Sequence, residues 1–597
     1  MGSLTLALSR TADPDPRVVE RMLDAAPHRG RERATLTVGR CSLGVSWAAG
    51  LRDASVASDG ERAAAFCGRL DNAGDVAKEL ADLGIAVGDD GPAALVLAAF
   101  AAFGDAVPER LRGVYAVAVT DGYGVWCFRD HLGFRSLFFR DDARAFVAAS
   151  EAKQVVAGAG VSREPDLDVL QAIFFGVYDD ETPAALRGVS RLRKSMLLVA
   201  GQRGTRRKTY WDPRPLLETD TSSEDERRAR FEDLMRQANA RAVTGDHDVV
   251  SLSGGIDSPA VAAFAAPEHL RLTGRRLAAL STVYPDLPSV DESHWVRLVA
   301  ERLDLDLRTY ERTARPLVAL DEQVRLLDGP VPGILVNDAM EHYAKAASLG
   351  FRTMLTGEMA EFVFDQRRYL LAHLLSTRRY RALRHHVGMQ QKKGVAPLAI
   401  VRQLTPAIVL RRAWIRYNRV RSTGARSRIP EWLDPGAVPG AVERYAERTT
   451  LDWTEQQLAA FDGPGLSAEA DTITEVAAGI VVRRPWADVD LWEFFLSLPA
   501  EAKFPNVTRK GLMREWARGR VPDEILDRPT KTVFNDSIVA RIDYAELQRW
   551  LVGPSTRIPG VRYARLADRI AAADMDVREF DWAKDLAAVH AFVGLWS

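Results

Sequence analysis

The chain has 597 residues, of which 27% are charged, and its formal net charge is −1. This length predicts two or more domains, and the charge balance excludes a chain that is basic overall, so we expect no nucleic-acid partner. The three cysteines, Cys41, Cys67 and Cys127, lie far apart without a CxxC pair, which argues against a disulfide framework or a zinc site. We identify no signal sequence and no apolar run of about eighteen residues, and expect a cytoplasmic protein.

Residues 4–201 consist mainly of short β-type runs separated by Gly and Asp turns. Helical patterns are few, such as RVVERMLDAA at 17–26 and PAALVLAAFAAF at 92–103. This pattern of short strands and turns predicts a mostly antiparallel α+β layer domain, which we place at 1–208. The polar, turn-rich stretch 210–226 is the expected linker.

Strand and helix patterns alternate in the second part of the chain, which we place at 222–597. Expected strands at 248–253 and 277–285 alternate with expected helices at 259–272 and 291–304, and a helix and a strand follow within 337–357. Alternating β and α units predict a parallel sheet with helices on both faces.

The sequence SGGIDS at 253–258 lies where the first of these strands passes into a helix. Such a turn collects anions, because free backbone N–H groups and the helix dipole point there. Gly254 and Gly255 permit positive φ and close ligand approach, and Ser253 and Ser258 offer hydroxyl donors. Asp257 would repel a bare phosphate, so a bridging divalent cation is expected. An ordinary glycine-rich turn with a solvated acid is the alternative.

SGGIDS resembles the pyrophosphate loop of the ATP pyrophosphatases, and nearly the whole chain resembles the asparagine synthetase family. The resemblance implies an Ntn-hydrolase-like α+β sandwich at 1–208 and, at 222–597, an adenine-nucleotide α-hydrolase-like ATP-pyrophosphatase domain with a parallel sheet and helical insertions. The N-terminal motifs are HRG at 28–30, GRLDN at 68–72, LRGVYAVAVTD at 111–121, RDHLGFRSLFF at 129–139 and AASEAK at 148–153. The C-terminal motifs are VDE at 290–292, LTGEMAE at 355–361, RRPWADVDLWEFFLSLP at 483–499 and RPTK at 528–531.

Two departures from the family pattern bear on function. The family's glutaminase uses an N-terminal cysteine exposed by removal of Met1, whereas this chain has Gly2 there. We therefore expect no ammonia from glutamine, and expect the substrate to supply its own amine. The family's Gly-(Asp/Glu)-Gly-x-Asp-Glu reads Gly-Glu-Met-Ala-Glu-Phe at 357–362, so Glu361 stands at the metal-binding aspartate and Phe362 replaces the next acid.

The resemblance also implies the site and its cofactors, ATP and Mg²⁺. Asp257 and Glu361 would hold the metal, Lys531 would reach the phosphates and the acyl group, and Glu358 would accept the proton of the attacking amine. A solvated loop at 357–362 and a surface role for Lys531 are the alternatives. The residues expected to line the nucleotide and pyrophosphate are Leu252, Ser253, Gly254, Gly255, Asp257, Ser258, Thr282, Thr356 and Gly357.

The stretch at about 366–430 has no Asp or Glu but repeated Arg pairs among apolar residues, which predicts an amphipathic helical insert with a basic face. It suits a docking face for an acidic partner, a membrane-surface contact or a lid over the triphosphate, unless its arginines meet acids elsewhere in the fold. A peripheral membrane contact is not what we predict.

With the chain length, this insert favours a lasso peptide cyclase over a β-lactam synthetase acting on a small β-amino acid. Such a cyclase adenylates an Asp or Glu side chain of a precursor core peptide and joins it to the peptide's N-terminal amine, releasing AMP and pyrophosphate. The resemblance implies a leader peptidase and a leader-recognition protein as further partners. An inactive peptide-binding scaffold is the alternative from another class.

Overall fold

The computed structural model describes residues 2–596, apart from 12, 52, 89–90, 162, 179–181, 203, 334, 362–368, 409–428, 435, 437–452, 463–464, 506–508, 529–531 and 555. Lys531 and Phe362 therefore lie outside the described residues, as do parts of the expected basic insert.

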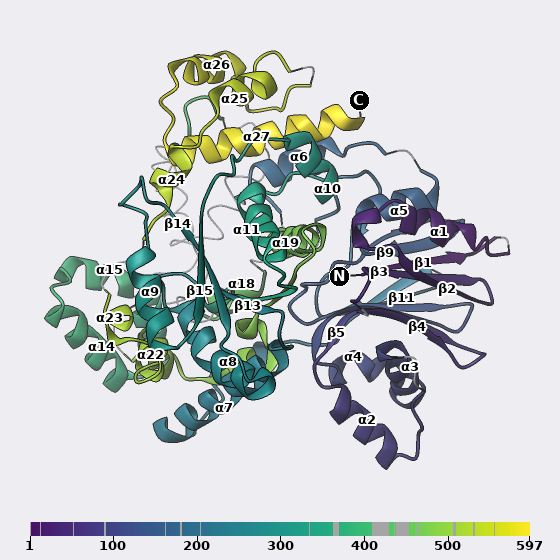
Figure 1. Cartoon of the computed structure of the whole chain (residues 1–597), viewed down its shortest axis with the longest axis horizontal. Coiled ribbons are helices and arrows are strands. Elements are labelled where there is room, and N and C mark those ends of the chain that lie inside the picture. Colours follow the sequence, from purple (N-terminus) through teal and green to yellow (C-terminus); the bar gives the residue numbers. More distant parts are fainter. Residues whose placement is uncertain are drawn as a thin grey trace.

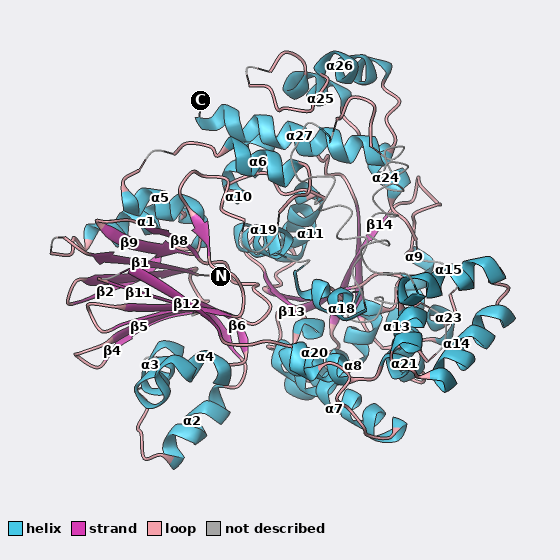
Figure 2. Ribbon diagram, turned by 180° about the vertical axis from the view of Figure 1, so that it is seen from behind, coloured by secondary structure: helices cyan, strands magenta, loops and turns pink. Residues whose placement is uncertain are grey.

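The N-terminal domain stacks two antiparallel sheets between helices (Figures 1 and 2). One sheet has the order β10-β8-β9-β1-β3-β2 and the other β12-β11-β7-β6-β5-β4. Their facing side chains form one apolar cluster that includes Leu6, Leu43, Ala65 and Ala118. The expected Ntn-type α+β sandwich is confirmed. The strands are β1 (Ser3–Ser9), β2 (Glu32–Val38), β3 (Cys41–Trp47), β4 (Ala54–Ser58), β5 (Ala63–Leu70), β6 (Gly113–Thr120), β7 (Val125–Arg129), β8 (Phe138–Asp141), β9 (Ala145–Ala149), β10 (Ser190–Arg191), β11 (Met196–Gly201) and β12 (Gly204–Thr209).

Helices cover both outer faces of this sandwich. Helices α1 and α5 lie over the first sheet, and α2 and α3 over the second (Figure 1). The stretch Pro92–Arg110 is long and apolar enough to cross a membrane, contrary to our reading of the sequence. Its apolar residues, including Val96 and Val107, belong to the core cluster beneath the second sheet. The helices are α1 (Arg17–Asp24), α2 (Ala73–Asp82), α3 (Pro92–Phe103), α4 (Val107–Arg110), α5 (Ala152–Ala159) and α6 (Leu167–Phe174).

The C-terminal domain has a five-stranded, all-parallel sheet in the order β15-β14-β13-β16-β17. Helices cover both of its faces, as the alternating pattern predicted: α7, α8 and α9 contribute to one apolar cluster and α11 to another. The chain runs outward from β13 on one side and then returns to β16 on the other. The strands are β13 (Asp248–Ser251), β14 (Ala278–Val283), β15 (Asp306–Glu311), β16 (Thr353–Leu355) and β17 (Val481–Arg483); the helices so far are α7 (Glu224–Ala242), α8 (Asp257–Thr273), α9 (Ser293–Arg302), α10 (Leu320–Leu327) and α11 (Val336–Ser348).

Helical insertions complete this domain. The described part of the basic insert contains α13, α14 and α15, which confirms its expected helical character. The last helix, α27, packs against α6 of the N-terminal domain and against α10 (Figure 1). The remaining helices are α13 (Leu370–Ser376), α14 (Tyr380–Lys392), α15 (Pro397–Ile408), α18 (Trp453–Asp462), α19 (Gly465–Ala477), α20 (Val489–Ser497), α21 (Ala500–Lys503), α22 (Gly511–Trp516), α23 (Asp523–Leu526), α24 (Asn535–Val539), α25 (Tyr544–Leu551), α26 (Tyr563–Ala572) and α27 (Val577–Trp596).

Candidate active site

A cavity of about 410 Å³ opens at the carboxyl edge of the parallel sheet, beyond β13, β14 and β16. These strands flank the point where the strand order reverses, which is where ligands bind in open α/β sheets. Of the nucleotide residues expected from the sequence, Leu252, Ser253, Thr282 and Thr356 line this cavity, together with Glu358. The other lining residues are Ser251, Ser281, Tyr284, Glu292, Arg312, Leu335, Asp338, Ala339, His342, Tyr343, Met354, Phe534, Ile538 and Arg541.

Side chains at the start of α8 and just before α9 hold the loop after β13. The Ser253 backbone N–H donates to the Ser258 hydroxyl at 2.9 Å, and the two serine hydroxyls lie 3.1 Å apart. The Gly254 N–H donates to the Glu292 carboxylate at 2.9 Å. Helix α8 begins immediately after, at Asp257, so its positive dipole end faces the loop.

The glycines of this region serve close packing rather than an unusual backbone conformation. Neither Gly254 nor Gly255 is among the glycines with positive φ, so the conformational part of our expectation was wrong. A Cβ on Gly254 would lie 2.8 Å from the Trp295 Cβ, whereas one on Gly255 would meet only a hydroxyl at 3.4 Å. A Cβ on Gly357 would lie 2.4 Å from the Ser258 backbone nitrogen. The loop after β16 therefore touches the first turn of α8 at Gly357.

Asp257 forms an ion pair that the sequence did not reveal. Both carboxylate oxygens lie within 2.6 Å of the Lys510 Nζ atom, and the side chains are 23% and 9% exposed. Lys510 has a φ of 55° just before α22, a left-handed conformation of the kind that concentrates at functional sites. No local motif marks this lysine, and only the fold brings it to Asp257.

A metal ion beside this loop would rely on few protein ligands. In the described part of the chain, no three His, Cys, Asp or Glu side chains cluster as a metal site. A Mg²⁺ carried by a nucleotide keeps several waters and needs only one or two carboxylates. Asp257 is a partly exposed oxygen donor next to the loop, but both of its carboxylate oxygens contact Lys510, so a metal ion there would have to displace that ammonium. Glu361 is exposed and lies outside the cavity lining, so its metal role stays a prediction.

Glu358 belongs to a cluster of three acids around one arginine. The Arg484 guanidinium lies 2.5 Å from Glu358 and 2.5 Å from Glu475, with Asp471 at 4.0 Å. Burial and the neighbouring Glu358 raise the pKa of Asp471 to about 7. Burial also raises the pKa of Glu475. The cluster therefore holds one acid, Asp471, that is able to exchange a proton near neutral pH, close to the half-exposed carboxylate of Glu358.

Two further features of the cavity suit a polar ligand. The Thr356 hydroxyl is buried without a hydrogen-bond partner among the described residues, which leaves it available to a bound molecule. Arg312 and Arg541 both pair with Asp338, at 3.8 and 2.7 Å. Burial and the nearby Arg312 lower the pKa of His342 to about 4, so this histidine is neutral at physiological pH. None of the charged or titratable residues Arg312, Asp338, His342 and Arg541 lies in a motif that the sequence could identify.

Comparisons with known proteins agree with this architecture. The asparagine synthase family model matches residues 230–592, and the glutamine amidotransferase domain model matches residues 1–211. Among similar proteins, "Putative asparagine synthetase [glutamine-hydrolyzing]" of Mycobacterium tuberculosis H37Rv is 27% identical over 77% of this chain and 72% of its own length. "Asparagine synthetase [glutamine-hydrolyzing] 3" of Bacillus subtilis is 24% identical over 78% of this chain and 74% of its own.

A solved structure, the glutamine phosphoribosylpyrophosphate amidotransferase of B. subtilis with ADP and GMP, covers 60% of this chain and 81% of that one, at 13% identity and a TM-score of 0.27. The family assignment rests instead on the two domain models, and members of this family use ATP, typically with Mg²⁺, to form amide bonds. The chain belongs to the asparagine synthase family, with an N-terminal domain of the glutamine amidotransferase type, and is an ATP-dependent amidoligase.

Proposed function

We propose that this amidoligase is a lasso peptide cyclase that draws its amine from the substrate instead of from glutamine. It joins the N-terminal amine of a precursor core peptide to an Asp or Glu side chain of the same peptide. The carboxylate first attacks the α-phosphorus of ATP and displaces pyrophosphate. The amine then attacks the acyl adenylate, which releases AMP and one proton and leaves an isopeptide bond.

The observation that carries this proposal is the environment of Gly2, which occupies the place of the missing nucleophile. Its N–H donates to both carboxylate oxygens of Asp53 at 3.0 Å. A Cβ at this position would lie 2.2 Å from the Ser46 carbonyl oxygen and 2.8 Å from the Ala54 Cβ. The backbone is therefore packed for glycine, and a cysteine side chain has no room without a backbone shift.

The cysteines elsewhere in the sequence offer no replacement. Cys41, Cys67 and Cys127 are all buried. Burial raises the pKa of Cys41 to about 12 and raises those of the other two thiols as well. A buried thiol that keeps its proton is a poor nucleophile. An amine already present in the substrate is then the simplest source of nitrogen.

The residues of the cavity suit the two steps. The unpartnered Thr356 hydroxyl offers a donor to the nucleotide, and Lys510 places a cation beside Asp257. Preorganised donors and cations of this kind stabilise the charge that develops on departing phosphates. A Mg²⁺ ion held by Asp257, with Glu361 as the second expected ligand, would add positive charge to the pyrophosphate. Glu358 is the proposed proton acceptor for the amine, and Lys531 the proposed cation near the acyl group.

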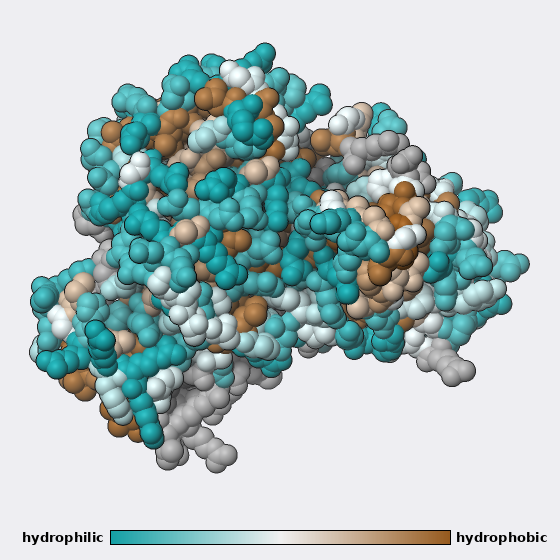
Figure 3. Space-filling model, turned by 90° about the horizontal axis from the view of Figure 1, so that it is seen from below, coloured by the Kyte–Doolittle hydropathy of each residue, from teal (hydrophilic) through white to brown (hydrophobic). Residues whose placement is uncertain are grey.

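The basic insert supports a peptide substrate over a small one. A hollow of about 700 Å³ is lined by Arg378, Arg379, Arg381, His385 and His386, among others. Helix α15 exposes apolar side chains nearby, and Figure 3 shows apolar surface on the side where α14 and α15 lie in Figure 1. Arg379 already pairs with Glu218 and Glu501, so acids within the fold hold one arginine of the insert. We propose the remaining surface as the docking face for the precursor peptide, which a leader peptidase and a leader-recognition protein would deliver.

The test incubates the purified chain with ATP, Mg²⁺ and a peptide that has a free N-terminal amine and one internal Asp or Glu. We expect AMP and pyrophosphate in equal amounts and a product lighter than the peptide by one water. The matched control is the same peptide with an acetylated amine, which should yield no cyclic product. AMP release only with a carboxyethylated β-amino acid would favour a β-lactam synthetase. Absence of any ATP affinity would favour a scaffold, and glutamine consumption would contradict the proposed amine source.

A further inference from the structure

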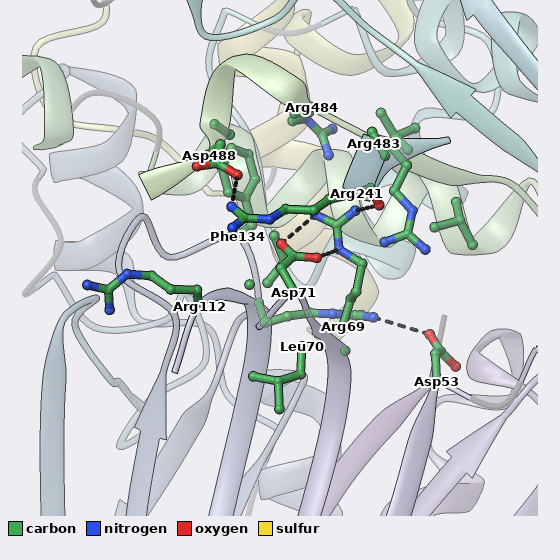
Figure 4. A pocket seen from close by; sticks show the side chains of 18 of the residues that line it. Asp53, Arg69, Leu70, Asp71, Arg112, Phe134, Arg241, Arg483, Arg484 and Asp488 are labelled. Atoms are coloured by element: carbon green, nitrogen blue, oxygen red, sulfur yellow. Dashed lines mark hydrogen bonds and ion pairs between the residues drawn. The ribbon is translucent and has the colours of Figure 1, made fainter. Parts of the chain in front are cut away.

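A second cavity, of about 400 Å³, lies between the two domains (Figure 4) and shares no lining residue with the cavity at the edge of the parallel sheet. The N-terminal domain contributes residues around the ends of β5 and β6, and the C-terminal domain contributes β17 and the start of α20. A volume of this size suits a small molecule. Nothing in the amide-forming chemistry above uses it.

The charges that line this cavity are unequal in number, with six arginines against three aspartates. Most of these arginines have an acidic partner. Arg69 pairs with Asp71, Arg135 with Asp53, Arg241 with Asp488, Arg112 with Asp490, and Arg484 with Glu358 and Glu475. Arg135 nevertheless leaves two nitrogens, Nε and Nη1, buried without an acceptor in the described residues.

Arg483 differs from the other five arginines of the lining in its lack of an ion-pair partner among the described residues. It projects from β17 toward the space between Arg69 and Asp53 (Figure 4), and no ion pair joins it to any acid within the described ranges. Its Nε atom is buried and lacks a hydrogen-bond acceptor there. Burial, followed by the charge of Arg69, lowers the pKa of Arg483 to about 9. A desolvated cation without a partner is unfavourable, and a bound anion would relieve it.

We propose that this cavity is a binding site for a small monocarboxylate whose carboxylate pairs with Arg483. A single negative charge is favoured, because Asp53 and Asp71 in the lining would repel a second one. The rest of the ligand is apolar and about the size of an amino-acid side chain, because Leu51, Leu70 and Phe134 line the same space. A planar carboxylate also matches the fork of donors that a guanidinium presents.

The interdomain cavity is linked to the nucleotide cavity through one residue, Arg484. Arg484 lines the interdomain cavity, and on its other side it contacts Glu358, which lines the nucleotide cavity. The proposed ligand pairs with Arg483, which directly precedes Arg484 in the chain, so the site adjoins the residue that holds Glu358.

The experiment titrates the purified chain with valerate and, as the matched neutral ligand, valeramide. Calorimetry and thermal unfolding should detect valerate and not valeramide. Inorganic phosphate is the second comparison, because a doubly charged anion should bind more weakly. Equal binding of valeramide would overturn the proposal, and tighter binding of phosphate would overturn its monocarboxylate part.

Variants separate this site from the nucleotide cavity. Arg483→Met should weaken valerate binding roughly tenfold or more, because a hydrogen-bonded charge is lost. The same change should keep or raise the unfolding temperature of the ligand-free protein, since it removes a cation that lacks a partner. Leu70→Trp, which fills the cavity, should also abolish binding. Arg275→Met, at a residue whose side chain is 73% exposed, and Asp257→Ala should leave it intact. Undiminished binding in Arg483→Met, or loss in Asp257→Ala, contradicts the assignment.

Discussion

The pair of Asp257 and Lys510 offers the most direct test of the site geometry. Its bidentate contact, within 2.6 Å, joins side chains that are 23% and 9% exposed. Loss of one partner of a buried pair costs about 3–5 kcal/mol, and we expect about 2–3 kcal/mol here because water still reaches Asp257. Asp257→Asn and Lys510→Met should each destabilise the protein by that amount. The double variant should be little worse than either one, since it leaves no unpaired charge, so the coupling energy is about 2 kcal/mol.

Urea unfolding followed by tryptophan fluorescence measures this cycle. One of the 13 tryptophans, Trp486, lies at the site, where its indole N–H donates to the Asp257 carbonyl at 3.2 Å. The matched control is the exposed pair of Lys208 and Glu109, at 3.2 Å and with side chains 46% and 43% exposed. Its coupling should lie between about 0 and 1 kcal/mol. Additive effects of Asp257→Asn and Lys510→Met would refute the idea that the two charges depend on each other.

Three other predictions follow from the packing and the acids. Gly357→Ala should destabilise the protein by about 1–3 kcal/mol and slow pyrophosphate release, because its Cβ would clash with α8. Gly255→Ala is the control and should keep wild-type stability in the same urea assay. The pKa of Asp471 is raised from 3.8 to about 7, so between these pH values the folded state binds more protons than the unfolded state. Stability should therefore fall as pH rises through this range. Asp471→Asn should flatten this part of the profile of unfolding temperature against pH, and an unchanged slope would contradict the assignment. Gly2→Cys should lower the unfolding temperature and gain no glutaminase activity, and glutamate release from glutamine by this variant would disprove the packing argument.

The sequence predicted most of the fold, because hydrophobic periodicity is a local signal. The expected helix at 92–103 coincides with α3, and the strand expected at 277–285 contains β14. The turn expected at 253–258 follows β13, but its last two residues, Asp257 and Ser258, already belong to α8. Hydrophobic patterns of period two and 3.6 reflect which face of a strand or helix is buried, so they can be recognised without knowledge of the tertiary structure.

The sequence did not predict the charge partners of the site. Lys510 and Asp257 are 253 residues apart in sequence, and Arg484 and Glu358 are 126 apart. No local pattern specifies such pairs, because the sheet topology alone decides which loops meet. The glycines of the loop were misjudged for a related reason. Glycine marks either positive φ or close packing, and the neighbour that requires Gly254, Trp295, comes from a different element.

The two domains are packed together through buried ion pairs and apolar contacts. Lys153 pairs with Asp328, and Arg191 lies 2.9 Å from Glu469, both across the boundary and both buried. Substituting one partner of such a pair, while the domains stay packed, would leave a buried charge without that partner and cost several kcal/mol. Apolar contacts extend the same argument, since Phe134 belongs to the core cluster of the C-terminal domain. The N-terminal sandwich therefore packs against the cavity wall that carries Arg484. Arg484 in turn contacts Glu358.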